Sequence, residues 1–330
     1  SLLFAACAPT EEEPAEEPVL VCQITDTGGI DDKSFNETAW NGVLQAEEEL
    51  GIQSNYLESQ EVADYETNIN AFMEEGCDLI ITVGFLIADA TAAAAEANPD
   101  QKFSIVDFAY DPTIPNVVGQ VFETDEAAFL AGYVAADVTE TGVVGTFGGL
   151  PIPTVTIFMD GFVAGVRQYN EDNGTDVQVI GWNPEEETGS FTNSFDDQQL
   201  GREMAVSMMD EGADIIMPVA GPVGLGAAAA IQERGNAYVI GVDSDWYLTS
   251  PEYGDITLTS VMKKMDATTF QVIEDVVNDE FEGGTVVGTL ENEGVAIAPF
   301  HDLSDLVSDE LQTRLDELRQ AIIDGEIVLD

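Results

Sequence analysis

Residues 24–40 read ITDTGGIDDKSFNETAW and continue the apolar run VLVCQIT at positions 19–25. A short apolar run followed by two glycines predicts a buried strand that ends in a tight turn. Ser34 and Glu37 have the S-x-x-E spacing of a capping box, which predicts a helix that begins at Ser34. Apolar residues recur at helical spacing as far as Leu50, so the stretch opens a strand–turn–helix unit whose helix packs one face on a core.

The same alternation of strands and helices runs through the rest of the chain. Apolar runs of strand length are followed by segments with an apolar stripe at helical spacing. Repeated units of this kind imply parallel sheets with helices on both faces, so the predicted fold class is α/β with two doubly wound lobes. Near the end of the chain, helices are predicted at Ala267–Phe281 and at Ser304–Asp324, the latter ending at Gly325.

Extra elements after the two lobes indicate that the chain crosses between the lobes more than once. Residues 1–18 are expected to be a leader and linker. We expect the first lobe at 19–122 plus 252–288, and the second lobe at 123–251 plus 289–330. The crossings would form a multi-strand hinge, and they are expected near Gln120–Thr124, Trp246–Asp255 and Thr289–Gly294.

The chain is very acidic, with 64 aspartate and glutamate residues against 9 lysine and arginine residues and a formal net charge of −55. Phosphate-rich partners require basic residues, so we expect no nucleic-acid partner and no binding to anionic membrane surfaces by the body of the protein. Most of the carboxylates are interpreted as a solvated surface suited to a salty medium. The 45% of hydrophobic residues is typical of a folded chain.

Residues 1–18, SLLFAACAPTEEEPAEEP, resemble the end of a bacterial lipoprotein signal followed by an acidic linker. In such a signal the cysteine after the small residues is acylated, so Cys7 is the expected lipid carrier. The protein would then be anchored on the extracytoplasmic side of the cell membrane. The alternative is an N-terminus with an incidental cysteine. Since no later segment has about 18 consecutive apolar residues, no other membrane span is predicted.

The residues that nucleophilic and metal catalysis require are scarce. His301 is the single histidine and has no nucleophile beside it in the sequence. Histidine and cysteine give too few zinc ligands, and calcium-loop spacing and glycine-rich phosphate loops are absent from the sequence. Cys22 and Cys77 lie beside apolar runs, where they fit either buried thiols or a disulfide. We therefore expect no metal, no cofactor and no enzymatic activity.

The residues directly after the predicted strands form a polar and glycine-rich set. Ligands of doubly wound sheets bind outside the carboxyl ends of the strands, so this set predicts a binding site. Phe35 would lie in the first helical turn there, as either a platform for a planar ligand or a hydrophobic plug under the loop. Asp31 and Asp32 fit turn or helix-entry positions. The other members are Asp26, Gly28, Gly29, Gly84, Asp107, Gly148, Gly149, Trp182, the AGPVGLG loop at 220–226 and the aspartates of DSD at 243–245.

Several motifs, in order along the chain, resemble the basic membrane protein family of lipoprotein substrate-binding proteins. The resemblance extends from about Val19 to Phe300 and implies a type I periplasmic-binding fold whose two lobes close on a ligand. That family includes the purine nucleoside receptors of ABC importers. The motifs are VCQITDTGGIDDKSFNETAWNGV (21–43), SFDDQQLGREMA (194–205), GADIIMPVAGPVGLG (212–226), YVIGVDSD (238–245) and LTSVMKKMD (258–266).

The resemblance also implies which residues recognise the base of a nucleoside. Acidic groups that contact the base match Asp26 and Asp107, and the phenylalanine and asparagine of the first motif match Phe35 and Asn36. A second aromatic on the opposite lobe would complete a sandwich around the ring. The F-x-D-x-x-x-G-[KR] pattern assigns it to Phe195, with Phe191 and Trp182 as alternatives.

The ribose hydroxyls would be held, by the same resemblance, at Gly221, Asp243 and Lys263. Lysine is rare in this chain, so the adjacent pair Lys263 and Lys264 indicates a hydroxyl donor beside a strand end, the alternative being surface charge. Pro222, directly after the loop glycine, departs from the family pattern and bears on which ligand is bound.

Together, these features predict a lipid-anchored receptor that captures a nucleoside, most of all a purine nucleoside, and delivers it to an ABC permease. Closure of the lobes, rather than bond breaking, would be the mechanism. The alternatives are a receptor for a sugar or an autoinducer-like ligand on the same fold, a sensory receptor for the same ligand, and a nucleoside hydrolase.

Overall fold

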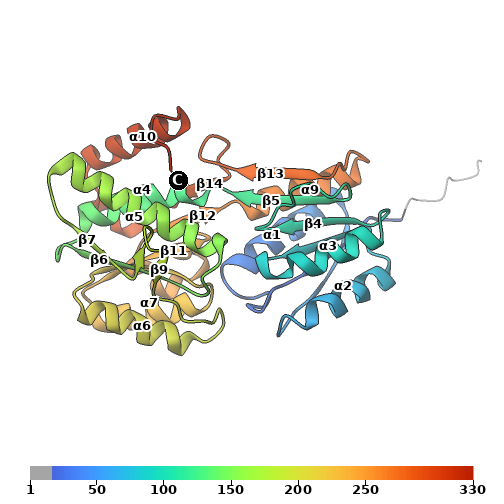
Figure 1. Ribbon diagram of the computed structural model, residues 1–330, viewed down its shortest axis with the longest axis horizontal. Helices are drawn as coiled ribbons and strands as arrows, with labels where there is room; N and C mark the ends of the chain where they lie inside the picture. The colour runs from blue at the N-terminus through green and yellow to red at the C-terminus, as the bar shows by residue number, and fades with distance from the viewer. Residues whose placement is uncertain (1–16, 330) are drawn as a thin grey trace, which may run out of the picture.

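The structure, a computed structural model, describes residues 17–329 and contains two six-stranded sheets, each in its own lobe (Figure 1). The expected lipid carrier, Cys7, lies outside these residues. Among the described residues, no helix is both long enough and apolar enough to cross a membrane. The predicted pair of doubly wound parallel-sheet lobes is confirmed.

The first lobe has a fully parallel sheet in the order β13-β5-β4-β3-β1-β2. Two helices cover each face, α1 and α9 on one and α2 and α3 on the other. The strands are β1 (Leu20–Ile24), β2 (Gln53–Leu57), β3 (Leu79–Val83), β4 (Lys102–Val106), β5 (Val117–Phe122) and β13 (Gly284–Gly288). The helices are α1 (Phe35–Leu50), α2 (Asp64–Glu75), α3 (Ala88–Ala97) and α9 (Met265–Val277), with the 3-10 turn η1 (Phe85–Ile87).

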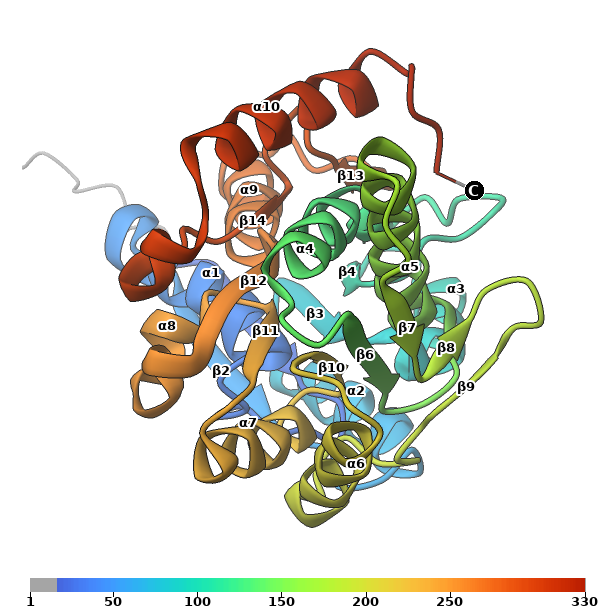
Figure 2. The same ribbon diagram turned by 90° about the vertical axis from the view of Figure 1, so that its left-hand side faces the viewer.

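The second lobe repeats the plan with the order β14-β12-β11-β10-β6-β7, in which only β14 runs antiparallel to its neighbour. Figure 2 shows α4, α5 and α10 on one face and α6 and α7 on the other. The strands are β6 (Val143–Gly148), β7 (Gln178–Ile180), β10 (Ile215–Val219), β11 (Tyr238–Asp243), β12 (Thr257–Lys263) and β14 (Val295–Ile297). The helices are α4 (Thr124–Val138), α5 (Pro153–Asn173), α6 (Gln198–Asp210), α7 (Val223–Arg234), α8 (Trp246–Thr249) and α10 (Asp309–Ile323), beside the hairpin β8 (Trp182–Asn183) and β9 (Thr188–Gly189).

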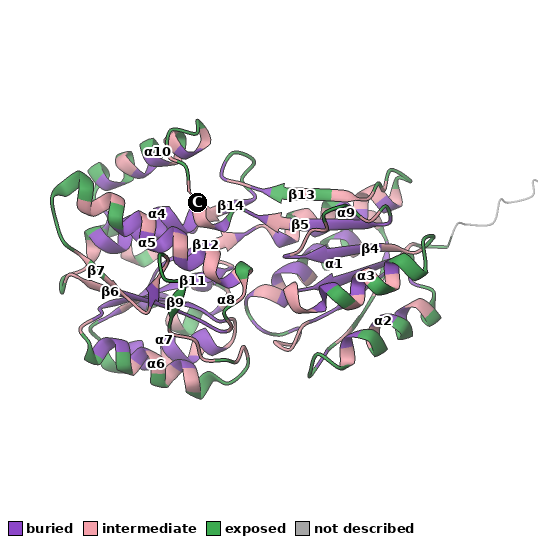
Figure 3. Ribbon diagram, viewed as in Figure 1, coloured by how far each residue is buried: buried purple, intermediate pink, exposed green. Residues whose placement is uncertain are grey.

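Burial on both faces explains why the central strands are continuous apolar runs. Successive side chains of a strand point to opposite faces of its sheet. In the first lobe Val21 and Leu79 belong to the core under α1, whereas Cys22 and Ile80 belong to the core under α2. Figure 3 shows that the central strands of both lobes are buried and that the exposed residues lie mainly on the outer helix surfaces.

Cys22 and Cys77 form a disulfide in the core under α2, with their Cα atoms 6.0 Å apart. The bond joins β1 to the residue that closes the loop before β3, so it links two neighbouring strands of the sheet. Of the two readings that the sequence left open, the disulfide is the one found. Disulfides of this kind persist in oxidising compartments outside the cytoplasm.

The chain crosses between the lobes three times, after β5, after β12 and between β13 and β14. The first and third crossings match the predicted hinge segments at 120–124 and 289–294. The predicted crossing at 246–255 is wrong, and so is the assignment of the strand at 257–263 to the first lobe. This strand, β12, pairs with β11 and β14 in the second sheet, and the crossing follows Lys263. Two lobes with parallel, fully buried strands give the same apolar pattern, so the pattern does not identify the lobe.

The predicted helix at Ser304–Asp324 is two elements in the structure. Residues His301–Leu306 form the 3-10 turn η3, and α10 begins after Ser308, whose hydroxyl accepts a hydrogen bond from the Leu311 N–H at 3.1 Å. This serine cap fixes the start of the helix at Asp309, five residues later than predicted. Helix α9 is likewise shifted, since it covers 265–277 rather than 267–281.

Helices α4 and α5 pack at unusually close range through glycines. A Cβ atom on Gly165 of α5 would lie 1.9 Å from the Phe129 carbonyl oxygen of α4, and one on Gly132 of α4 would lie 2.1 Å from the Phe162 carbonyl oxygen. Only a residue without a side chain allows this approach. Because α4 follows the first crossing, this contact secures the hinge to the body of the second lobe.

We predict that Gly165→Ala lowers the free energy of unfolding by about 3 kcal/mol or more, because the added methyl forces the two helices apart. Urea denaturation followed by circular dichroism measures this change. Gly284→Ala is the matched control, since a Cβ there meets nothing within 4 Å. Equal stability of the two variants would contradict the close helix contact.

Candidate functional site

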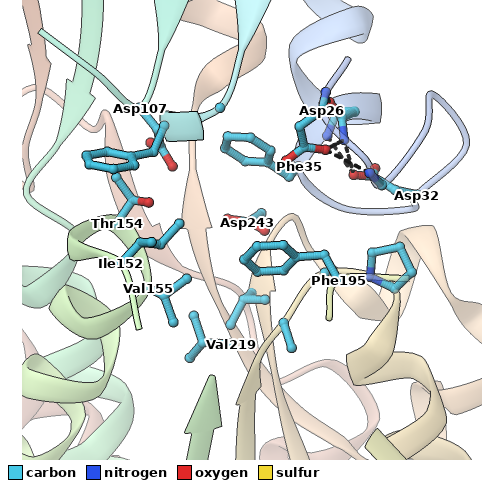
Figure 4. A pocket seen from close by; sticks show the side chains of 18 of the residues that line it. Asp26, Asp32, Phe35, Asp107, Ile152, Thr154, Val155, Phe195, Val219 and Asp243 are labelled. Atoms are coloured by element: carbon cyan, nitrogen blue, oxygen red, sulfur yellow. Dashed lines mark hydrogen bonds between the residues drawn. The ribbon is translucent and has the colours of Figure 1, made fainter. Parts of the chain in front are cut away.

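A cavity lies between the lobes where the carboxyl ends of the strands of both sheets face each other (Figure 4). About 600 Å³ of space free of protein atoms, including the opening to solvent, lies within its walls. All eight residues predicted to bind a ligand line this cavity, namely Asp26, Phe35, Asn36, Asp107, Phe195, Gly221, Asp243 and Lys263. The structure therefore brings together every member of the predicted set.

A cluster of two carboxyl groups and one amide forms part of the first-lobe wall. The Asn36 Nδ2 group donates to Asp26 Oδ1 at 2.7 Å and to Asp32 Oδ2 at 3.0 Å, and the Asp26 N–H donates to Asn36 Oδ1 at 3.1 Å. Burial raises the pKa of Asp26, and the hydrogen bonds from Asn36 and from the Gly28 N–H oppose that shift. Asp26 and Asn36 thus hold each other in fixed positions beside the cavity.

The predicted capping box at the start of α1 does not form. Asp32 caps the helix instead, because its Oδ2 accepts from the Asn36 N–H at 2.8 Å and its Oδ1 accepts from the Glu37 N–H at 3.0 Å. The Glu37 carboxylate accepts from the Lys33 N–H rather than from Ser34. Burial raises the pKa of Asp32 to about 7, against the lowering effect of these N–H groups. Asp32 therefore occupies the helix-entry position that was predicted for it, and it also lines the cavity.

A buried ammonium group holds the two lobes together at the back of the cavity. Lys263 Nζ lies 2.6 Å from Asp107 Oδ2 of the first lobe and 3.6 Å from Asp243 Oδ1 of the second. The lysine side chain is 3% exposed, which excludes the surface-charge interpretation. Burial lowers the pKa of Lys263, but the two aspartates outweigh it and the net shift is upward. Burial raises the pKa of Asp107, and Lys263 opposes that shift.

Two phenylalanines line the cavity from opposite lobes. Phe35 comes from the first turn of α1, and Phe195 comes from the loop before α6 (Figure 4). The Phe195 ring sits directly over Gly149, where a Cβ atom would lie 2.3 Å from it. Lys263 Nζ lies 5.1 Å from the centroid of the Phe35 ring, within cation–π range. Phe35 is therefore part of the cavity wall and not a plug beneath the loop.

The two alternatives for the second aromatic lie elsewhere. Trp182 donates from its indole N–H to Asp160 at 2.7 Å, and its ring meets Phe191 edge to face at 5.9 Å. Neither of them is part of the cavity wall. Among the three candidates, Phe195 is the one that faces Phe35.

Sequence reasoning missed part of the apolar lining. Val219 and Val242 lie in the last two residues of strands β10 and β11, and the others follow a strand end as the predicted residues do. All of them except Thr154 are apolar, so they carry no polar or glycine signature. Reading one more turn after each strand would have found most of them. They are Phe85, Leu86, Ile152, Thr154, Val155, Phe158, Val219 and Val242.

Within residues 17–329, no group of three or more acidic, histidine or cysteine side chains is arranged to hold a metal ion. The single histidine, His301, lies outside the cavity and pairs with Asp245 at 2.7 Å while its ring stacks on Tyr247. What the cavity offers is an aromatic pair, carboxylate acceptors and one ammonium donor. This combination can bind a small planar molecule that carries hydrogen-bonding groups.

Two parallel-sheet lobes, three crossings and a cavity at the facing strand ends define a two-lobed substrate-binding protein of the type I periplasmic class. The sequence model of the family described as "ABC transporter substrate-binding protein PnrA-like" matches residues 19–330. The chain belongs to this family of ABC transporter substrate-binding proteins, which act outside the cytoplasm and bind substrates without transforming them. The resemblance inferred from the motifs is thereby confirmed.

Individual relatives agree along nearly the whole chain. The chain is 35% identical over 333 residues to "Basic membrane protein A" of Borreliella burgdorferi, covering 100% of this chain and 92% of that protein. It is 32% identical over 324 residues to "ABC transporter nucleoside-binding protein BmpA" of Lactococcus lactis subsp. cremoris, covering 93% and 87%. A crystal structure of an ABC transporter solute-binding protein from Aeropyrum pernix superposes with a TM-score of 0.85 at 30% identity, covering 95% and 94%.

We predict that Lys263→Met lowers the free energy of unfolding by about 3–5 kcal/mol near pH 8, because Asp107 loses its buried counter-charge. Without the cation the pKa of Asp107 rises further above its unfolded value, so the folded state gains stability when the carboxyl is protonated. The loss should therefore be smaller near pH 5. Denaturant unfolding at the two pH values measures it. Lys264→Met, half-buried and without an ion pair among the described residues, is the control and should change stability little.

Proposed function

We propose that this protein captures a nucleoside, foremost a purine nucleoside, in the cavity between its lobes and delivers it to the permease of an ABC importer. The observation that carries the proposal is the placement of Phe35 and Phe195 on opposite lobes of the cavity that also contains Asp26, Asp107 and Lys263. The relative from Lactococcus lactis that is named as a nucleoside-binding protein supports the same choice of ligand.

In this proposal the base lies between the rings of Phe35 and Phe195. Stacking on an aromatic ring adds about 0.5–1.5 kcal/mol per pair beyond the burial of apolar area. Asp26 and Asp107 accept hydrogen bonds from the N–H groups of the base. Of the carboxylate oxygens of Asp26, Oδ2 receives no hydrogen bond from the described part of the chain, so it is available to a ligand.

The remaining residues of the cavity set are proposed to hold the ribose hydroxyls. Lys263 donates to one of them, and Asp243 and the Gly221 backbone hold the others. Gly221 has a φ of +52°, which lets the loop before α7 turn its backbone toward the ligand. Because ligand groups from both lobes are needed, the ligand binds the closed arrangement better and shifts the lobes toward it.

The receptor is proposed to be tethered to the extracytoplasmic side of the cell membrane by a lipid on Cys7, with the acidic residues up to position 18 as a linker. ABC permease subunits are the proposed partners, and the strongly acidic surface would face basic patches on them.

Calorimetric titration with inosine, guanosine, adenosine, cytidine, uridine and free ribose tests this proposal. We expect at least one nucleoside to bind tightly, and purine nucleosides to bind better than pyrimidine nucleosides. Tight binding of ribose with no response to any nucleoside would refute it in favour of a sugar receptor. Release of free base from inosine during incubation would instead indicate a hydrolase.

We predict that Phe35→Ala weakens nucleoside binding about tenfold or more, through lost stacking and burial. The melting temperature of the unliganded protein should stay nearly unchanged, because the ring faces a cavity. Phe191→Ala provides the matched control, since Phe191 packs on Trp182 outside the cavity and its loss should affect stability rather than affinity. A large drop in the melting temperature of Phe35→Ala with unchanged affinity would count against the proposal.

A further inference from the structure

Two short segments from opposite lobes meet beside the cavity. One is Lys33–Ser34 before α1 in the first lobe, and the other is residues 242–244 after β11 in the second. The Ser34 hydroxyl lies 2.8 Å from Asp243 Oδ2 and 3.1 Å from the Val242 carbonyl oxygen. The Ser244 hydroxyl donates to the Lys33 carbonyl oxygen at 3.0 Å. These hydrogen bonds connect the lobes without passing through the hinge.

The Ser34 hydroxyl is free for this contact because another residue caps the helix. Asp32 accepts hydrogen bonds from the backbone N–H groups at the start of α1, and the Ser34 side chain makes no capping bond. Ser34 is 2% exposed, so water has little access to its hydroxyl in this arrangement. A buried hydroxyl needs a partner, and the partner available here belongs to the opposite lobe.

Asp243 is the point where the contact and the cavity meet. Its Oδ2 accepts from Ser34, its Oδ1 faces Lys263 Nζ at 3.6 Å, and its side chain lines the cavity. Its φ of +67° lies in the left-handed backbone region, which is rare for a residue with a side chain, and it interrupts the extended conformation of the strand at Asp243. Asp243 can therefore take its full set of donors only when the first lobe is close.

We propose that Ser34 is a latch residue, which holds the lobes closed over the ligand by donating to Asp243 although Ser34 itself touches no ligand. Within residues 17–329, Ser34 is not part of the cavity wall. Ser34 is thus a positioning residue that acts through Asp243, and Ser244 supports it through Lys33. This latch rests on the proposed nucleoside function, because it predicts how long a captured ligand is retained.

When the lobes separate, the hydrogen bond between the Ser34 hydroxyl and the Asp243 carboxylate breaks, and each group forms hydrogen bonds with water instead. A hydrogen bond to a charged acceptor is worth enough to shift an equilibrium by roughly tenfold or more. Removal of the hydroxyl leaves the ligand contacts in place and favours the open state. Because encounter occurs in the open state, the effect falls on ligand release rather than on association.

Stopped-flow measurement of nucleoside association and release, with the tightest ligand of the calorimetric panel, tests the latch. We expect Ser34→Ala to release the ligand roughly tenfold faster while the association rate changes less than twofold. Ser59→Ala is the matched control. Ser59 is fully buried, and its hydroxyl accepts from Asn68 Nδ2 within the first lobe, so its loss should leave both rates unchanged.

Ser244→Ala provides a second variant in case Ser34→Ala does not fold, since Ser244 is only half-buried. Its release rate should rise about twofold to fivefold, because its acceptor is an uncharged carbonyl. Equal release rates for the wild type and both variants overturn the latch and leave the nucleoside function standing.

If no nucleoside binds the wild type, the proposed function fails, and the latch is then judged on the protein without ligand. Small-angle X-ray scattering gives the radius of gyration of the wild type and of Ser34→Ala. A larger radius in the variant supports the latch, because the lobes then spend more time apart. Identical radii overturn it.

Discussion

The arrangement of the two lobes depends on one buried ammonium group, that of Lys263. An isolated charge of this kind would be strongly unfavourable in a protein interior, so it needs carboxylates within hydrogen-bonding distance. Asp107 ends a strand of the first sheet and Asp243 ends a strand of the second, and both adopt the left-handed backbone region, with φ of +64° and +67°. The ends of the two sheets must therefore face each other with Lys263 between them, and the space left beside it is the cavity.

The position of Lys263 is informative because the chain has so few cations. Of its 9 basic residues, Arg167, Arg202 and Arg234 make exposed ion pairs with neighbouring carboxylates, and such pairs contribute little to stability. The cavity wall carries four carboxylates, those of Asp26, Asp32, Asp107 and Asp243, against the single ammonium of Lys263. A neutral ligand with several N–H and O–H groups finds hydrogen-bond acceptors on these side chains.

Much of the fold could be predicted from the sequence for a physical reason, and the family resemblance selected eight residues that all line the cavity. Continuous apolar strands, helical stripes and polar strand ends reflect burial and ligand access, which act on each segment separately. Which strands pair with each other in a sheet is not visible in the pattern of any single segment. The strand at 257–263 reads the same in either sheet, so its place beside β11 was missed. Phe158 and Phe85 line the cavity as apolar residues that look like core residues in the sequence.

The misread capping box shows how a local rule and a tertiary contact compete for the same side chain. Ser34 and Asp32 are two residues apart, and either can accept hydrogen bonds from the first turn of α1. The carboxylate has two oxygens and accepts from the N–H groups of Ser34, Asn36 and Glu37, so the serine hydroxyl is not needed there. It is left as a buried donor beside the cavity, where Asp243 of the other lobe is the acceptor. Because Asp32 caps the helix, the Ser34 hydroxyl is available to form a hydrogen bond with Asp243 when the lobes are closed.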